Sequence, residues 1–119
     1  MQVLIVGREL VANRLRPLLA SQGVETVEFT SGFGEGDLPA PGERRLALVD
    51  SMAPGLESVC RSINCSGGIP LVLVVERGDE VDWSDVERLK ASGFVSSSAR
   101  DPELSARLGA VIRRLAPVG

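Results

Sequence analysis

Three short runs of aliphatic residues limit what this chain can fold into. They are QVLIV at Gln2 to Val6, LALV at Leu46 to Val49 and PLVLVV at Pro70 to Val75, and none contains a charged residue. Continuous apolar runs of this length are typical of parallel strands that are buried on both faces and covered by helices. The chain therefore predicts an α/β domain with these runs at its centre.

The segment after the first run has the apolar spacing of an α-helix. The helix is expected to begin at Arg8 and to end at Gln22-Gly23, where glycine suits a helix cap. Pro17 within it should either kink the helix or mark a register adjustment. The residues expected to face the core are Leu10, Val11, Leu15, Leu18 and Leu19.

Three further helices are predicted. The first runs from Pro54 to Asn64, the second starts at a capping box formed by Ser84 and Glu87, and the last opens with Asp101-Pro102-Glu103. The inward-facing residues are expected to be Leu56, Val59, Cys60 and Ile63 in the first of these, and Leu104, Leu108, Val111, Ile112 and Leu115 in the last.

Two more strands complete the pattern, at Val24 to Phe29 and at Phe94 to Ser97. Ser31 to Arg44 contains four glycines and two prolines, which predicts a loop where a doubly wound fold would place a helix. Residues 1–119 thus predict one α/β domain, a flavodoxin-like doubly wound sandwich. Its five-stranded parallel sheet should have the order 2-1-3-4-5, with the second helix short or missing.

The composition argues against several classes of function. A net charge of −3 gives no overall attraction to nucleic acid or to an anionic membrane. Histidine is absent, which removes histidine-dependent catalysis and the commonest zinc ligand. Cys60 is expected to fill the core and Cys65 to lie near a helix end, with no metal between them. With no signal sequence or long apolar segment, we expect a cytoplasmic protein that does not associate with membranes.

Asp50 ends the LALV run, and a loop with Pro54 and Gly55 follows it. A carboxylate in this position lies at the carboxyl edge of the sheet, where open α/β folds build their sites. Asp50 is therefore the first candidate for a functional residue.

Segments along nearly the whole chain resemble the receiver domains of bacterial two-component response regulators. VLIVGRELV resembles their first strand and turn, VDSMAPG the third strand and its loop, and LVLVVERGDEVD the fourth strand and its loop. ASGFVSSSARDPEL is similar to the fifth-strand region of the subgroup that usually carries a C-terminal helix-turn-helix. The resemblance implies a receiver-like fold.

The resemblance also implies five positions for phosphoryl chemistry, and only Asp50, the phospho-acceptor position, matches. The acidic pair that binds Mg²⁺ falls on Gly7 and Arg8, and Glu9 is one position late. The hydroxyl position falls on Val75. The lysine position falls on Ser97, or on Ser96 or Ser98 after a one-residue slip. We therefore expect an atypical, phosphorylation-independent receiver without cofactor or metal, with a degenerate pocket at Gly7, Arg8, Glu9, Asp50, Val75 and Ser97.

Arg8 allows two interpretations. Its guanidinium could pair with the Asp50 carboxylate where the metal would otherwise lie and hold the pocket closed. Alternatively, Arg8 points to solvent and Asp50 only caps the turn that follows it.

The function expected from these features is a non-enzymatic regulatory module that acts as a homodimer or through a protein partner. Candidate surface residues are Trp83, Phe94, Arg107, Arg113 and Arg114; equally, Trp83 could anchor a loop and the arginines could simply be solvated. This domain is not expected to bind nucleic acid directly. A DNA-binding domain could be attached in a longer chain, which would make it the regulatory half of a transcription regulator.

Two alternatives remain open. Asp50 could still accept a phosphoryl group, or the chain could be a small-ligand or nucleotide-binding Rossmann-like domain. Gly7 after the first strand and Glu28 at the end of the second suit a dinucleotide site, but the turn GRELVA lacks the further glycines that a pyrophosphate needs. Gly32, Gly34 and Gly36 are not followed by the Lys-Ser/Thr of a phosphate loop.

Overall fold

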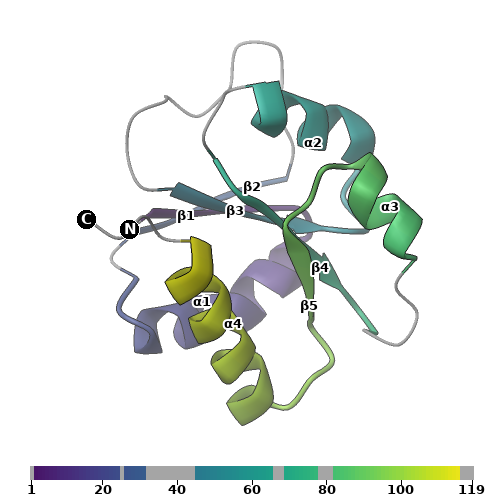
Figure 1. Ribbon diagram of the computed structural model, residues 1–119. Helices are drawn as coiled ribbons and strands as arrows, with labels where there is room; N and C mark the ends of the chain where they lie inside the picture. Colours follow the sequence, from purple (N-terminus) through teal and green to yellow (C-terminus); the bar gives the residue numbers. More distant parts are fainter. Residues whose placement is uncertain (1, 25, 32–44, 66–68, 78–81, 116–119) are drawn as a thin grey trace.

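Five parallel strands form the centre of the molecule (Figure 1). The computed structural model describes residues 2–24, 26–31, 45–65, 69–77 and 82–115. The strands are β1 (Gln2–Val6), β2 (Thr26–Thr30), β3 (Arg45–Asp50), β4 (Leu71–Val75) and β5 (Gly93–Ser96). They lie in the order β2-β1-β3-β4-β5, and all four neighbouring pairs are parallel. The predicted fold class and strand order are thus confirmed.

Helices cover both faces of this sheet. One face carries α1 (Glu9–Ser21) and α4 (Asp101–Leu115), and the other carries α2 (Leu56–Cys65) and α3 (Trp83–Arg88) (Figure 1). The aliphatic strands explain this arrangement, because their side chains point alternately to the two faces and each face must be removed from water. Neighbouring residues of β1 illustrate the alternation, since Ile5 packs into the core beside α1 and Val6 into the core beside α2. No helix in the described part of the chain is both long and apolar enough to cross a membrane.

The helix after β1 was predicted correctly except for one residue. α1 contains Pro17 and is capped at Gln22, as expected, where the backbone N–H of Gln22 donates to the carbonyl of Leu19. Leu10 was wrongly assigned to the core, since its exposed fraction is 64%. Five residues at about 100° each place Leu10 roughly 140° around the helix axis from the fully buried Leu15, and so on the solvent side.

The prediction that Ser84 and Glu87 form a capping box was also wrong. The N-cap of α3 is Asp82, whose carboxylate accepts a hydrogen bond from the backbone N–H of Ser84 at 2.9 Å. This is the ordinary capping contact, moved two residues upstream because an aspartate there reaches the free N–H directly. The hydrogen bonds from Ser84 lower the pKa of Asp82.

The other predicted elements agree to within a few residues where the structure describes them. Val59, Cys60 and Ile63 are buried in α2, while Leu56 is half-buried. Cys65 is exposed and both cysteines are free thiols, and burial raises the pKa of the Cys60 thiol to about 11. Residues 32–44, on which the prediction of a short or missing second helix depends, lie outside the described residues, as does the side chain of Leu115.

The corrected orientation of α1 can be tested with two leucines of the same helix. We expect Leu15→Ala to lower the free energy of unfolding by about 2–5 kcal/mol, because it removes a fully buried side chain. Leu10→Ala should change it by less than about 0.5 kcal/mol, because that side chain is already exposed to water. Urea denaturation of both variants measures this, and equal losses would contradict the orientation.

Candidate functional site

The carboxyl edge of the sheet holds one buried charged side chain. Asp50 is only 1% exposed, and among the described residues it is the one buried residue that is polar or charged. Removing a carboxylate from water is costly unless hydrogen bonds or an opposite charge compensate it. The site is therefore defined by the groups that surround Asp50.

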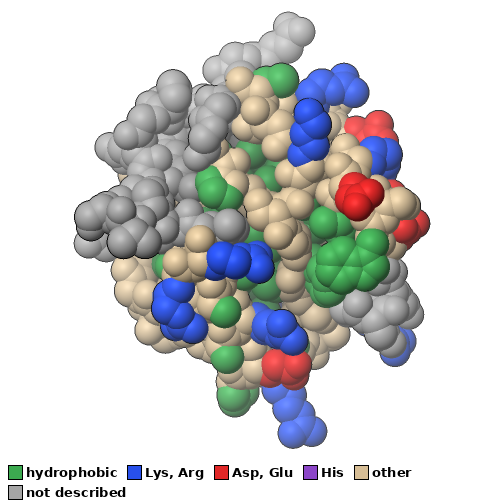
Figure 2. Space-filling model, viewed as in Figure 1, with side chains coloured by type: hydrophobic (Ala, Val, Ile, Leu, Met, Phe, Trp, Pro, Cys, Tyr) green, Lys and Arg blue, Asp and Glu red, His purple; other side chains and the backbone are tan. Residues whose placement is uncertain are grey.

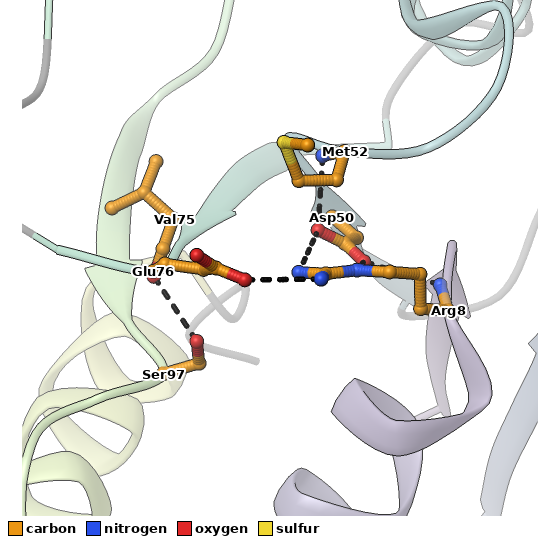
Figure 3. A network of polar contacts seen from close by, with 6 residues as sticks. All are labelled: Arg8, Asp50, Met52, Val75, Glu76 and Ser97. Atoms are coloured by element: carbon orange, nitrogen blue, oxygen red, sulfur yellow. Dashed lines mark hydrogen bonds and ion pairs between the residues drawn. The ribbon is translucent and has the colours of Figure 1, made fainter.

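Arg8 provides most of this compensation (Figure 3). Its Nε donates to Oδ2 of Asp50 at 2.7 Å, its Nη2 lies 3.3 Å from Oδ1, and its backbone N–H donates to Oδ2 at 3.1 Å. Of the two interpretations of Arg8, the structure thus shows the ion pair. The two-pronged contact is the geometry in which a guanidinium binds a carboxylate most strongly.

A second carboxylate lies on the other side of the same guanidinium. Nη1 of Arg8 donates to Oε1 of Glu76 at 3.0 Å (Figure 3). Glu76 is exposed and directly follows β4, the strand next to β3. The hydrogen bonds to Asp50 and Glu76 raise the pKa of Arg8, so this cation does not lose its proton.

Both oxygens of Asp50 are occupied by donors. Oδ1 accepts from the backbone N–H of Met52 at 3.0 Å as well as from Arg8, while Oδ2 accepts from two groups of Arg8. Burial by itself raises the pKa of Asp50, but the hydrogen bonds from Arg8 and Met52 outweigh it, and the pKa lies below its ordinary value. Asp50 is therefore an ionised, fully hydrogen-bonded carboxylate.

Gly7 allows β1 to approach Asp50 this closely. A Cβ atom at position 7 would lie 2.2 Å from Cβ of Asp50, and the φ angle of Gly7 is +140°, which L side chains rarely adopt. Close packing against Asp50 thus explains the glycine after the first strand.

The other predicted pocket residues do not join the ion pair. Glu9 is exposed in the first turn of α1, and the side chain of Val75 has no polar atom. The hydroxyl of Ser97 donates to the carbonyl of Val75 at 3.3 Å, and that of Ser96 to the carbonyl of Glu76 at 2.9 Å (Figure 3 shows Ser97). These hydroxyls therefore bind carbonyl groups at the end of β4. The position at which receiver domains carry a lysine has no positive charge here.

Two contributing residues were missed from the sequence. Glu76 could have been found, because an acid that directly follows the run PLVLVV must lie at the same sheet edge as Asp50. Nothing in the sequence pattern identified Arg14 as a contributing residue. Its guanidinium donates to the carbonyls of Ala99 at 2.6 Å and Ser97 at 3.4 Å, and it pairs with Asp101. Only the folded chain brings α1 beside the loop between β5 and α4.

The residues at this edge do not fit a divalent cation. Mg²⁺ needs several oxygen ligands with free lone pairs, whereas a guanidinium lies between the carboxylates of Asp50 and Glu76 and binds both. The described residues contain no cluster of three or more side chains suited to holding a metal ion.

The candidate surface residues gather away from this edge. Trp83, Phe94, Arg107 and Arg114 line one hollow of about 650 Å³, and Arg113 is exposed on the same helix, outside that lining. Trp83 is 64% exposed, and its ring meets Phe94 edge-on with 5.2 Å between the ring centres. Trp83 is therefore both a contact of β5 and an exposed aromatic group.

The sequence is similar to bacterial signalling proteins, although no protein-family model matches the chain. The chain is 32% identical over 118 residues to the sensory transduction protein RegX3 of Mycobacterium tuberculosis, an alignment that covers 94% of the chain and 51% of RegX3. It is 32% identical over 108 residues to the DNA-binding response regulator MtrA of Mycolicibacterium smegmatis, covering 87% of the chain and 46% of MtrA. The chain thus spans about half the length of these relatives.

Solved structures agree at the level of the fold. A response regulator receiver domain from Rhodospirillum rubrum superposes with a TM-score of 0.71 at 13% identity, over 99% of this chain and 96% of that domain. Full-length FixJ from B. japonicum gives a TM-score of 0.72 at 18% identity, over 98% of this chain and 59% of FixJ. The sheet order, the acid that ends β3 and these similarities agree: the chain has the fold of a receiver domain, and its sequence similarity to response regulators supports a receiver domain of the two-component type.

Proposed function

We propose that this receiver domain is a non-catalytic signalling module that works without Mg²⁺-dependent phosphorylation, and in that sense is atypical. The observation that carries the proposal is the pairing of Arg8 with Asp50 through Nε at 2.7 Å and Nη2 at 3.3 Å. The carboxylate of Asp50, at the phospho-acceptor position, is thus already bound by the side chain of Arg8.

The chemistry of phosphoryl transfer supports this proposal. A carboxylate that attacks phosphorus needs an oxygen lone pair directed at the phosphoryl group, and it needs cations that neutralise the charge on the transferred oxygens. Here both oxygens of Asp50 already accept hydrogen bonds, and the carboxylate is 1% exposed. The positions that would bind the phosphoryl group hold Val75 and Ser97, which offer no positive charge.

The output is proposed to be an interaction with a second copy or with a protein partner, through the face that carries Trp83, Phe94 and the arginines of α4. An exposed aromatic residue beside a hollow is a common centre of such interfaces. Because MtrA is named a DNA-binding response regulator and the chain spans about half of it, we further propose that the domain is the regulatory half of a cytoplasmic transcription regulator. An attached domain, and not this one, would bind DNA.

Phosphorylation is tested directly by mass. After incubation with acetyl phosphate and Mg²⁺, intact-mass spectrometry should show no phosphoryl adduct, because Asp50 has neither an accessible oxygen nor a metal site. A typical receiver domain treated in parallel is the positive control. An adduct that disappears in Asp50→Asn would overturn the proposal and favour the phosphorylatable alternative.

Mg²⁺ itself should leave the stability unchanged. A ligand raises the melting temperature only if it binds the native state, and Arg8 lies where the cation would be held. Thermal denaturation with and without millimolar MgCl₂ measures this, with CaCl₂ as a control for general ionic effects. A rise specific to Mg²⁺ would show that the guanidinium can be displaced.

The ion pair should contribute to stability. We expect Arg8→Ala to lower the free energy of unfolding by about 1–3 kcal/mol, because it leaves a buried carboxylate with only backbone donors. Arg100→Ala is the matched control, since Arg100 is exposed and its loss should cost less than about 0.5 kcal/mol. Equal effects in urea denaturation would remove the role given to Arg8.

The pH dependence of stability has a defined sign. The pKa of Asp50 is lower in the folded state than the ordinary value of 3.8, so its contribution is complete above that value and disappears as the pH falls through the folded-state pKa. The difference in unfolding free energy between the wild type and Asp50→Asn should therefore be constant near neutral pH and shrink below about pH 4. A difference that grows on acidification would contradict the ionised pair.

A further inference from the structure

Another hollow lies between α2 and α3, on the face of the sheet opposite α1 and α4. Its volume is about 330 Å³, at the lower end of the roughly 300–1,000 Å³ that small-molecule sites occupy. None of its lining residues belongs to the Asp50 site or to the face that carries Trp83 and the arginines of α4. A function of this hollow therefore goes beyond the proposed function of the domain.

Two contacts between the helices bound this hollow. Nearer the start of α2, Glu57 forms an ion pair with Arg88 of α3. Nearer its end, the side-chain amide of Asn64 donates to the carbonyl of Leu89 at 3.0 Å. Residues 57 and 64 are roughly two helical turns apart, so both lie on the same face of α2. The hollow is thus a recess whose two ends are held by contacts between the helices.

Positive charge predominates in this recess, although the whole chain has a net charge of −3. Arg61, Arg88 and Lys90 line it, and Glu57 is the one acid among the described residues that do so. Glu57 pairs with Arg88, whereas neither Arg61 nor Lys90 has an ion-pair partner within the described part of the chain. Figure 2 shows Lys and Arg side chains over the junction of α2 and α3, with acidic ones beside them. Two unpaired cations at one recess favour an anionic ligand.

Lys90 occupies a backbone position that glycine usually fills. Its φ angle is +55°, and it directly follows Leu89, the C-cap of α3. Its N–H donates to the carbonyl of Glu87, and the N–H of Ala91 donates to that of Val86, which closes the end of the helix. Glycine is favoured in this motif, because a side chain in the left-handed region is strained. A lysine here gives up backbone stability and supplies a cation to the recess.

We propose that the recess between α2 and α3 binds a small organic molecule that carries a phosphate monoester. Such a phosphate has about two negative charges at neutral pH and three acceptor oxygens, which match the unpaired cations of Arg61 and Lys90. The rest of the ligand lies over Cys60 and Leu89, which are buried and line the recess. A nucleic acid or an acidic protein segment fits less well, because these cations surround one bounded recess and do not form a line.

Cys65 provides a test of whether the recess is occupied. It lines the recess as an exposed free thiol, whereas Cys60 is buried and burial raises its pKa to about 11. Millimolar ribose 5-phosphate or glycerol 3-phosphate should slow the alkylation of Cys65 by N-ethylmaleimide about threefold or more, because thiol reactivity depends on access. Ribose and glycerol at the same concentration should not slow it. Peptide mapping by mass spectrometry assigns the label to Cys65.

Two single variants each remove one cation, and calorimetric titration with ribose 5-phosphate measures the effect. Arg61→Ala and Lys90→Gly should each weaken binding about tenfold, because each removes a charge-assisted contact with the phosphate. The melting temperature of Lys90→Gly should be unchanged or higher, since glycine adopts a positive φ without strain. Damage to the fold would therefore not explain its loss of affinity. Arg100→Ala, at an exposed position outside the recess, is the matched control and should bind normally.

Several outcomes would overturn the proposal. They are no protection of Cys65 by either ester, equal protection by ribose and glycerol, or full affinity in both Arg61→Ala and Lys90→Gly. Equal protection by sulfate or inorganic phosphate would overturn it in favour of a site for simple oxyanions, and stronger protection by a poly-glutamate peptide in favour of an acidic protein partner. A failed titration leaves the proposed function unchanged, whereas a phosphoryl adduct on Asp50 removes that function and leaves this inference unchanged.

Discussion

The burial of one negative charge organises the carboxyl edge of this domain. Asp50 is 1% exposed and would be strongly destabilising without compensation. Arg8, after β1, and Met52, after β3, both donate to it, and Gly7 must lack a side chain for the strands to come this close. The loop after β1 and the loop after β3 are thereby connected through the Asp50 carboxylate.

The helix α1 extends this constraint across the molecule. Arg8 immediately precedes α1, and Arg14 within it binds the carbonyls of Ser97 and Ala99 in the loop that leads to α4. At its other end, the side chain of Gln22 donates to the carbonyl of Ser105 in α4. Through α1, the contacts of Arg8, Arg14 and Gln22 thus connect the Asp50 site to α4 and to the loop before it.

Features that depend on neighbouring residues could be predicted from the sequence, whereas features that depend on contacts between distant segments could not. The strands and their order could be derived because apolar runs are local and parallel sheets bury them on both faces. Asp50 was recognised because it ends such a run. The orientation of Leu10 could not be derived, since a stripe of leucines leaves the rotation of α1 open until the sheet fixes it. Arg14 could not be found, because it binds backbone atoms more than eighty residues away.

The Arg8 pair also limits how such a domain could be regulated. A ligand shifts an equilibrium only by its difference in affinity for the two states, and a phosphoryl group or metal at Asp50 would first have to replace four hydrogen bonds. A partner that binds elsewhere meets no such cost. On the proposed function, control therefore passes to the concentration and affinity of the partner.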